Sequence, residues 1–199
     1  MSHVVVTAVG TDRPGIVAGV TRVFVDMGCN LEDSSMTILG GQFAMMLVVD
    51  APEGVDAAAL EAALAGPAAD LDLLVAVRPA EAAGADNGPL DDNRPLDDNP
   101  PLDDTAPLDD TASWTVSVYG ADHPGIVHGI AELLSAERIN ICDLGTRVIG
   151  DPARPVYAMV MGVSLPRGAD PDALAVRLGE VAARLGVDAS LHNSDADIL

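Results

Sequence analysis

Lysine is absent from this 199-residue chain, and all ten of its basic residues are arginine. Without lysine there is no P-loop lysine for a nucleotide phosphate, no Schiff-base lysine for a carbonyl group and no kinase-type lysine. The sequence also contains no G-x-S-x-G elbow and no dinucleotide-binding glycine pattern. These absences exclude much of enzyme chemistry and imply no cofactor.

Cysteine and long apolar runs are scarce as well. The two cysteines, Cys29 and Cys142, stand in neither a C-x-x-C nor a zinc-ligand spacing, and we expect both to be reduced thiols without a catalytic role. No apolar stretch approaches the roughly 20 residues of a membrane span, and no basic segment precedes an apolar one at the N-terminus. We therefore expect a cytoplasmic protein that does not enter a membrane.

Negative charge is abundant. The chain has 31 acidic against ten basic residues and a formal net charge of −21. Such a chain repels the phosphate backbones of nucleic acids, so direct binding to DNA or RNA is disfavoured. Hydrophobic residues make up 49% of the chain, which is enough to build a folded core.

A strict six-residue repeat divides the chain in the middle. Four units follow one another from Pro89 to Ala112, and each begins with the run Pro-Leu-Asp-Asp. Each unit combines two aspartates with a single leucine and at least one proline, so the segment repels itself and offers little apolar surface for folding. We predict an extended acidic linker over residues 81–112. The Asp pairs lack the ligand spacing of an EF-hand loop, and we expect no metal there.

The segments on either side of this linker are copies of one unit. Residues 10–33 read GTDRPGIVAGVTRVFVDMGCNLED and residues 120–143 read GADHPGIVHGIAELLSAERINICD, with nine of 24 positions identical. Farther along, FAMMLVVDAP aligns with VYAMVMGVSLP after a short insertion around residues 151–154. The chain thus divides into a first domain over residues 1–80, a second domain over residues 113–193 and a C-terminal tail over residues 194–199.

Both copies predict the same order of elements. A β-rich run over residues 4–9 ends at glycine, and apolar residues at helical spacing follow over residues 16–27. A second strand begins at Asn30, and Gly40-Gly41 marks a hairpin before an apolar third strand. A second helix, over residues 56–64 or 172–185, and a final strand complete each unit. This β-α-β-β-α-β order is the split βαβ of the ferredoxin-like fold, in the α+β class.

Two features of the strands lead to further expectations. Alternation in the second copy predicts that every second residue from Cys142 to Val148 lies on one face. The third strands, at residues 43–49 and 156–163, are apolar at both odd and even positions, although helices cover only one face of this fold. We therefore expect the other face of the sheet to be covered by another sheet or by a partner.

The same segments carry the chemistry of an amino acid site. Gly15 and Gly125 are expected in the first turns of their helices, where free N–H groups and the positive end of the dipole favour a carboxylate. Asn30 and Asp33 start the neighbouring strand, and their oxygens can accept hydrogen bonds from an ammonium group. The candidate ligand-binding residues are Asp12, Arg13, Pro14, Gly15, Ile16, Asn30, Leu31 and Asp33, with Asp122, His123, Pro124, Gly125, Ile126, Asn140, Ile141 and Asp143 in the second copy.

Structural roles remain open for several of these residues. Asp12 and Asp122 can serve as helix N-caps instead of contacting a ligand, and the prolines that follow them can merely preset the first helical turn. Gly19 and Gly129 lie inside helices, where glycine is unfavourable, and close packing of helix on sheet explains them best.

The copies differ where ligand specificity could reside. Arg13 corresponds to His123, and Ala18 corresponds to His128, so the two sites need not bind the same ligand. The two histidines are five residues apart instead of the four of a helical zinc pair, and we expect no metal at this loop.

The glycine-ended strand that runs through Asp-x-Pro-Gly-Ile-Val into a helix resembles the start of ACT domains, small ferredoxin-like modules that usually sense amino acids. The tandem copy resembles the glycine cleavage system transcriptional repressor family. The resemblance implies two ACT domains that pair within the chain or in a homodimer. It also implies a ligand between the first strand-to-helix loop of one domain and the second strand of the facing domain.

We therefore predict a non-enzymatic regulator in which a bound amino acid changes the pairing of the domains and hence the activity of a protein partner. Control of transcription in amino-acid, specifically glycine, metabolism is one such output. A ligand-free interaction scaffold is an alternative. Another is the regulatory part of an enzyme such as a formyltetrahydrofolate deformylase, although both copies together leave no segment for a catalytic domain.

Overall fold

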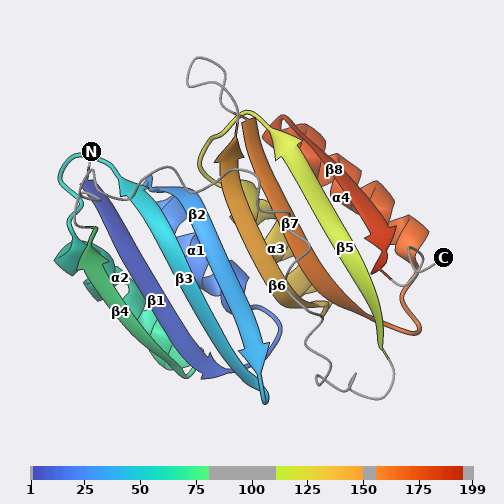
Figure 1. The fold of residues 1–199 in the computed structure, drawn as a ribbon, viewed down its shortest axis with the longest axis horizontal. Helices are drawn as coiled ribbons and strands as arrows, with labels where there is room; N and C mark the ends of the chain where they lie inside the picture. Colours follow the sequence, from blue (N-terminus) through green and yellow to red (C-terminus); the bar gives the residue numbers. More distant parts are fainter. Residues whose placement is uncertain (1, 81–110, 150–155, 195–199) are drawn as a thin grey trace, which may run out of the picture.

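The computed structural model describes residues 2–80, 111–149 and 156–194, which form two similar α+β units (Figure 1). The first unit consists of β1 (Ser2–Thr11), α1 (Ile16–Asp26), β2 (Asn30–Leu39), β3 (Gln42–Ala51), α2 (Ala57–Asp70) and β4 (Leu73–Pro79). The second unit consists of β5 (Thr111–Gly120), α3 (Ile126–Ala136), β6 (Asn140–Ile149), β7 (Val156–Pro166), α4 (Pro171–Leu185) and β8 (Val187–Asn193). The predicted β-α-β-β-α-β order is confirmed in both copies. No helix in the described ranges combines the length and the apolar character needed to cross a membrane.

Some predictions concern segments beyond the described ranges. The predicted linker lies outside the described residues, except that Thr111 and Ala112 already belong to β5. The insertion around residues 151–154 and the tail after Ser194 also lie outside the described residues.

The eight strands form one antiparallel sheet in the order β4-β1-β3-β2-β6-β7-β5-β8. The two units join at β2 and β6, where Ser35 is paired with Gly145. These two positions are equivalent in the repeat, so a local twofold axis passes between them. Beside the axis, the buried hydroxyls of Ser34 and Thr146 share a hydrogen bond of 2.9 Å.

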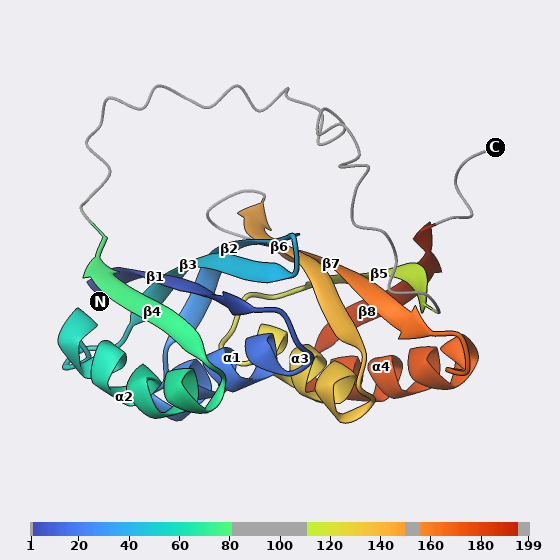
Figure 2. The same ribbon diagram turned by 90° about the horizontal axis from the view of Figure 1, so that it is seen from below.

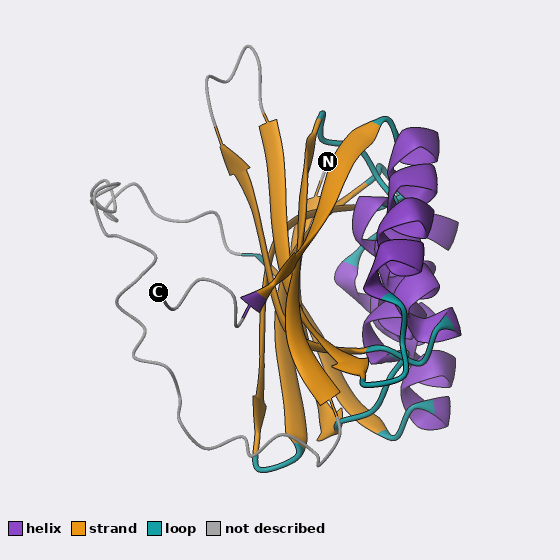
Figure 3. Ribbon diagram, turned by 90° about the vertical axis from the view of Figure 1, so that its right-hand side faces the viewer, coloured by secondary structure: helices purple, strands orange, loops and turns teal. Residues whose placement is uncertain are grey.

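Helices cover only one face of the sheet, as Figure 2 and Figure 3 show. Alternate strand residues such as Val6, Leu47 and Met161 are fully buried against the helices. On the other face, Met46 and Val160 are 56% and 43% exposed. The expected covering sheet is therefore not found among the described residues of the chain, because the two units extend one sheet sideways instead of stacking.

A β-bulge in each second strand changes which residues face the core. The register shifts between Leu31 and Asp33 in β2 and between Ile141 and Asp143 in β6. The bulge adds one residue, so Ile141 is buried and Cys142 is only partly buried. The alternation predicted from Cys142 to Val148 is therefore interrupted at Cys142, whereas Leu144 and Thr146 share the buried face.

The helical glycines allow close packing, but with a different partner from the one expected. A Cβ at Gly19 would lie 2.7 Å from Leu71 Cδ1, and a Cβ at Gly129 would lie 3.0 Å from Leu185 Cδ1. Leu71 is the C-cap of α2 and Leu185 is the last residue of α4. The glycines thus serve contacts between the two helices of each unit, not contacts between helix and sheet.

Gly120 tests how tightly the end of β5 packs against β8. A Cβ there would lie 2.6 Å from Val187 Cγ1 and 3.0 Å from Val187 Cα, so the backbone of β8 would have to move. We expect Gly120→Ala to lower the free energy of unfolding by about 1–3 kcal/mol. Gly145→Ala is the matched control in β6, where nothing lies within 4 Å of the added Cβ. Urea unfolding of both variants measures the difference. Equal stability of Gly120→Ala and Gly145→Ala would contradict the tight packing of Gly120 against Val187.

Candidate functional site

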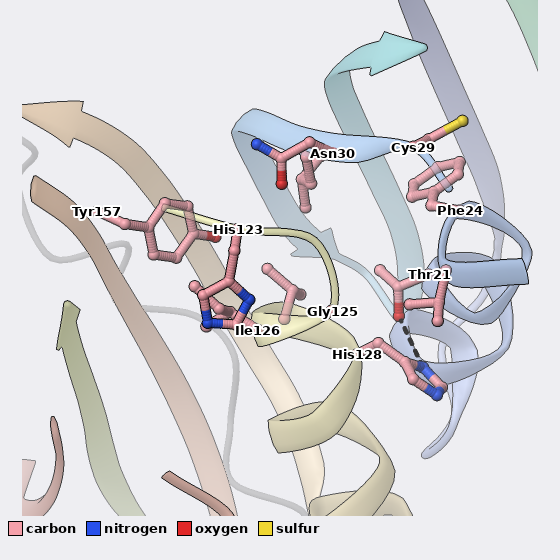
Figure 4. Close-up of a pocket in the computed structure, with 12 residues that line it drawn as sticks. Thr21, Phe24, Cys29, Asn30, His123, Gly125, Ile126, His128 and Tyr157 are labelled. Carbon is pink, nitrogen blue, oxygen red and sulfur yellow. Dashed lines mark hydrogen bonds between the residues drawn. The ribbon is translucent and has the colours of Figure 1, made fainter. Parts of the chain in front are cut away.

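Two small cavities lie between the units, related by the local twofold axis. Each one is formed by the strand-to-helix loop of one unit and the start of the second strand of the other. The Tyr157 cavity is lined by residues that include Gly125, Ile126 and Tyr157 together with Cys29, Asn30 and Leu31 (Figure 4). The Phe43 cavity is lined by residues that include Gly15, Ile16 and Phe43 together with Ile139, Asn140 and Ile141.

Both cavities are small in this structure. Their volumes are about 20 Å³ and 10 Å³ respectively, which is room for one or two water molecules. A larger ligand can enter only if the two units move apart locally.

A glycine in the left-handed backbone conformation stands at the end of each loop, where the helix begins. Gly15 and Gly125 are the N-caps of α1 and α3, both with φ of 96°, a conformation that side chains disfavour. The other unit also approaches Gly15 closely, since a Cβ there would lie 3.0 Å from Ser135 Oγ. No side chain of the described residues caps either helix, which leaves N–H groups of the first turn free. The glycines are thus the N-caps themselves and lie just before the first turn where they were predicted.

The loop aspartates bridge the two units instead of capping helices. Asn140 Nδ2 donates to Asp12 Oδ2 at 2.6 Å, and Asn30 Nδ2 donates to Asp122 Oδ2 at 2.9 Å. Because the N-cap is the glycine three residues later, each carboxylate is directed toward the other unit. The alternative in which these aspartates cap the helices is therefore wrong, and each cavity borders one asparagine–aspartate bridge.

Arg13 and His123 connect each loop to the end of the second helix in the same unit. Arg13 Nη2 donates to the carbonyl oxygen of Asp70 at 2.7 Å. His123 Nε2 lies 2.6 Å from the carbonyl oxygen of Leu185. Asp70 and Leu185 are the last residues of α2 and α4, and the guanidinium of Arg13 also complements the helix dipole of α2. The equivalent positions therefore share one structural role despite their different chemistry.

His128 links the units on one side of the twofold axis only. Its Nδ1 lies 3.2 Å from the carbonyl oxygen of Ala18 and 3.3 Å from Thr21 Oγ1, both in α1. The equivalent position in the first unit is Ala18, which carries no polar side chain. In the described ranges, no group of three or more His, Cys, Asp or Glu residues is placed to hold a metal ion.

Most of the predicted site residues gather at the two cavities. Asp122 borders the Tyr157 cavity through its bond to Asn30. The predicted residues that line a cavity directly are Asp12, Arg13, Gly15, Ile16, Asn140 and Ile141 at the Phe43 cavity, and Asn30, Leu31, His123, Gly125 and Ile126 at the Tyr157 cavity.

Four predicted residues are not brought to either cavity. Asp33 and Asp143 are exposed, because the bulges in β2 and β6 direct them away from the helices. Pro14 and Pro124 are exposed on the loops, ahead of the glycine N-caps, so they do not preset the first helical turn.

Sequence reasoning missed the aromatic wall of each cavity. Phe43 in β3 and Tyr157 in β7 occupy equivalent positions of the repeat, and both are 1% exposed. The aligned segments FAMM and YAMV contain this pair. A search of the two copies for aligned residues of similar shape but different polarity would have found it. Thr21 and Ser135, which line the cavities from the opposite unit, have no such signal.

The Asn140–Asp12 bridge makes a pH-dependent contribution to stability. Burial raises the pKa of Asp12, and the hydrogen bond from Asn140 partly lowers it, so the bond favours the charged carboxylate. Asn140→Ala should raise the pKa of Asp12 further and cost about 1 kcal/mol of unfolding free energy at neutral pH. The cost is fully present at pH values above the Asp12 pKa of the variant, where Asp12 is charged in both proteins. It disappears as the pH falls below the lower Asp12 pKa of wild type, where Asp12 is protonated in both.

Urea unfolding of both proteins between neutral and acidic pH measures this difference. In an Asp12→Asn background, the same Asn140→Ala change should show no such pH dependence. A cost that stays constant as Asp12 becomes protonated would exclude the bridge as its cause.

Comparison with known proteins places the fold among characterised families. The ACT domain family model matches residues 2–78. The glycine cleavage system transcriptional repressor of Escherichia coli is 30% identical over 145 residues, which cover 73% of this chain and 64%, less than two thirds, of the repressor. A UPF0237 protein of Methanocaldococcus jannaschii is 40% identical over 79 residues, which cover 39% of this chain and 88% of that protein.

A solved structure supports the side-by-side arrangement of the units. The aspartate kinase from Synechocystis has a TM-score of 0.50 to this chain at 15% identity, covering 90% of this chain and 26% of the kinase. At that identity the likeness concerns the fold alone. With the family match in the first unit and the same elements repeated in the second, the chain belongs to the ACT domain family, has two ACT-like halves in tandem, and is homologous to the glycine cleavage system transcriptional repressor.

Proposed function

We propose that this chain is a non-enzymatic regulatory protein that binds an amino acid between its two halves. The observation that supports the proposal is the composition of each cavity. An uncapped helix N-terminus from one half meets an asparagine–aspartate bridge to the other half. Free N–H groups at a helix start suit a carboxylate, and an aspartate suits an ammonium group. An amino acid carries both groups.

Binding is coupled to the pairing of the halves. At their present volumes the cavities have room for nothing larger than water, so an amino acid must displace the asparagine amide from its aspartate and part the halves locally. Its ammonium group then replaces the amide as the donor to Asp12 or Asp122. The ligand thus favours a second arrangement of the halves, and a partner that distinguishes the two arrangements responds to the ligand.

The output that we propose is control of transcription through a protein partner in the cytoplasm. The relative from Escherichia coli is named a transcriptional repressor. The net charge of −21 opposes direct contact with DNA, so a DNA-binding protein is the partner that fits.

A ligand-free scaffold is the second candidate. Both bridges are already hydrogen-bonded in the present arrangement, and neither cavity admits an amino acid without movement. In a scaffold, these bridges would only join the halves, and the protein partner would recognise a constant surface.

Ligand-induced stabilisation separates the two candidates. We expect the thermal midpoint of the full chain to rise with one or a few of the common amino acids, since a ligand at about 100 times its Kd adds roughly 2.7 kcal/mol. Asp122→Asn and Asp12→Asn keep an acceptor for the asparagine amide but lose the charge, and each should weaken binding at its own cavity at least tenfold. Asp188→Asn, an exposed change in β8, is the control. If no amino acid shifts the wild-type midpoint, the scaffold is the correct function.

Direct DNA binding should be negligible even at low salt. The purified chain and double-stranded DNA are mixed at low ionic strength, where counterion release favours binding most, and complexes are sought by gel mobility. We expect no complex at micromolar protein. A tight complex that dissociates as salt is added would instead show that the chain contacts DNA without a partner.

A further inference from the structure

The two cavities differ at their aromatic wall. Phe43 and Tyr157 occupy equivalent positions of β3 and β7, and both side chains are buried. The rings supply the same apolar surface. The single chemical difference between them is the phenolic hydroxyl of Tyr157, which Figure 4 shows directed toward the loop of His123.

The Tyr157 hydroxyl is buried without a hydrogen-bond partner among the described residues. The Thr146 hydroxyl is near enough to lower the pKa of Tyr157 in part, but it forms its own 2.9 Å bond with Ser34 Oγ. Burial is the largest influence and raises the pKa of Tyr157 well above its usual range. The phenol is therefore neutral and retains a proton to donate. An unpartnered buried hydroxyl is unfavourable, so a structure that keeps one gains from a ligand that pairs with it.

A second unpartnered atom belongs to the asparagine–aspartate bridge that borders the same cavity. Asp122 Oδ2 accepts from Asn30, whereas Asp122 Oδ1 is buried with no partner in the described structure. Asp122 and Tyr157 belong to the same cavity, Asp122 through its bond to the lining residue Asn30. The charges of Asp122 and Asp33 both contribute to the raised pKa of Tyr157. At the other cavity, neither oxygen of Asp12 is among the buried unpartnered atoms of the described residues, and Phe43 has no hydroxyl. The pair of unpartnered atoms is thus specific to one cavity.

A phenol and a free carboxylate oxygen at one cavity offer a ligand one donor and one acceptor. A ligand group that satisfies both must itself accept and donate, as a hydroxyl or a carboxamide does and a methyl group or hydrogen does not. We propose that Tyr157 makes its cavity selective for amino acids whose side chain carries a hydroxyl or a carboxamide, while the Phe43 cavity accepts an apolar side chain or none. This inference rests on the proposed function, amino acid binding at these cavities.

Calorimetric titration of the full chain tests the selectivity. The probes are L-serine, L-threonine, L-asparagine and L-glutamine, compared with glycine and L-alanine. We expect Tyr157→Phe to weaken the binding of the first four by at least tenfold and to leave glycine and alanine unchanged, because only the polar side chains lose a partner. Tyr119→Phe is the matched control, since Tyr119 is 47% exposed on β5.

A second measurement separates recognition from a structural role of the hydroxyl. Without ligand, Tyr157→Phe should unfold at the same temperature as wild type or higher, because the change removes an unpartnered buried hydroxyl. A clear loss of stability would overturn the proposal by showing that the hydroxyl already has a partner.

The outcomes also distinguish this proposal from the one on which it rests. If wild type binds polar amino acids and Tyr157→Phe keeps the same order of affinities, the selectivity is wrong and amino acid sensing stands. The selectivity is also wrong if wild type binds only glycine or alanine. If none of the six probes binds wild type, the selectivity is wrong, whereas amino acid binding itself fails only if no common amino acid raises the thermal midpoint of the chain.

Discussion

The pairing of β2 with β6 is the constraint on which the rest of the structure depends. Each of these strands would be the exposed edge of a four-stranded sheet in a separate unit, with unpaired N–H and C=O groups. Joining them removes both edges at once and places Ser35 opposite Gly145 on a local twofold axis. The buried hydrogen bond between Ser34 and Thr146 makes a shifted register unfavourable, because a slip would leave both hydroxyls unpaired.

The candidate site follows from that pairing. Since the axis passes between β2 and β6, the start of each strand reaches the loop of the other unit, and α1 lies beside α3. Asn30 meets Asp122, and Asn140 meets Asp12, across the same joint. Neither unit contains a complete cavity by itself. A ligand at this position therefore responds to the pairing of the halves, which is the property that a regulatory module needs.

The twofold relation holds for the backbone more strictly than for the side chains. The left-handed glycines and the asparagine–aspartate bridges are repeated in both units with closely similar geometry. The residues around them have diverged, with Tyr157 against Phe43 and His128 against Ala18. The repeated features maintain the fold of each loop and the joint between the halves. The divergent ones alter the polarity and size of the cavity lining, which allows two related sites to differ in what they bind.

The sequence by itself determined the order of elements in each half, because the apolar periodicity and the glycine positions report on backbone conformation over a few residues. The repeated loop residues, Gly15 and Asn30 among them, also identified the segments that form the cavities. Only the tertiary structure decided that the halves extend one sheet and that Asp12 bonds to Asn140. It also decided that the bulges direct Asp33 away from the cavities. The first two depend on contacts between residues more than a hundred positions apart, and the bulge depends on how β2 pairs with β3, neither of which local patterns encode.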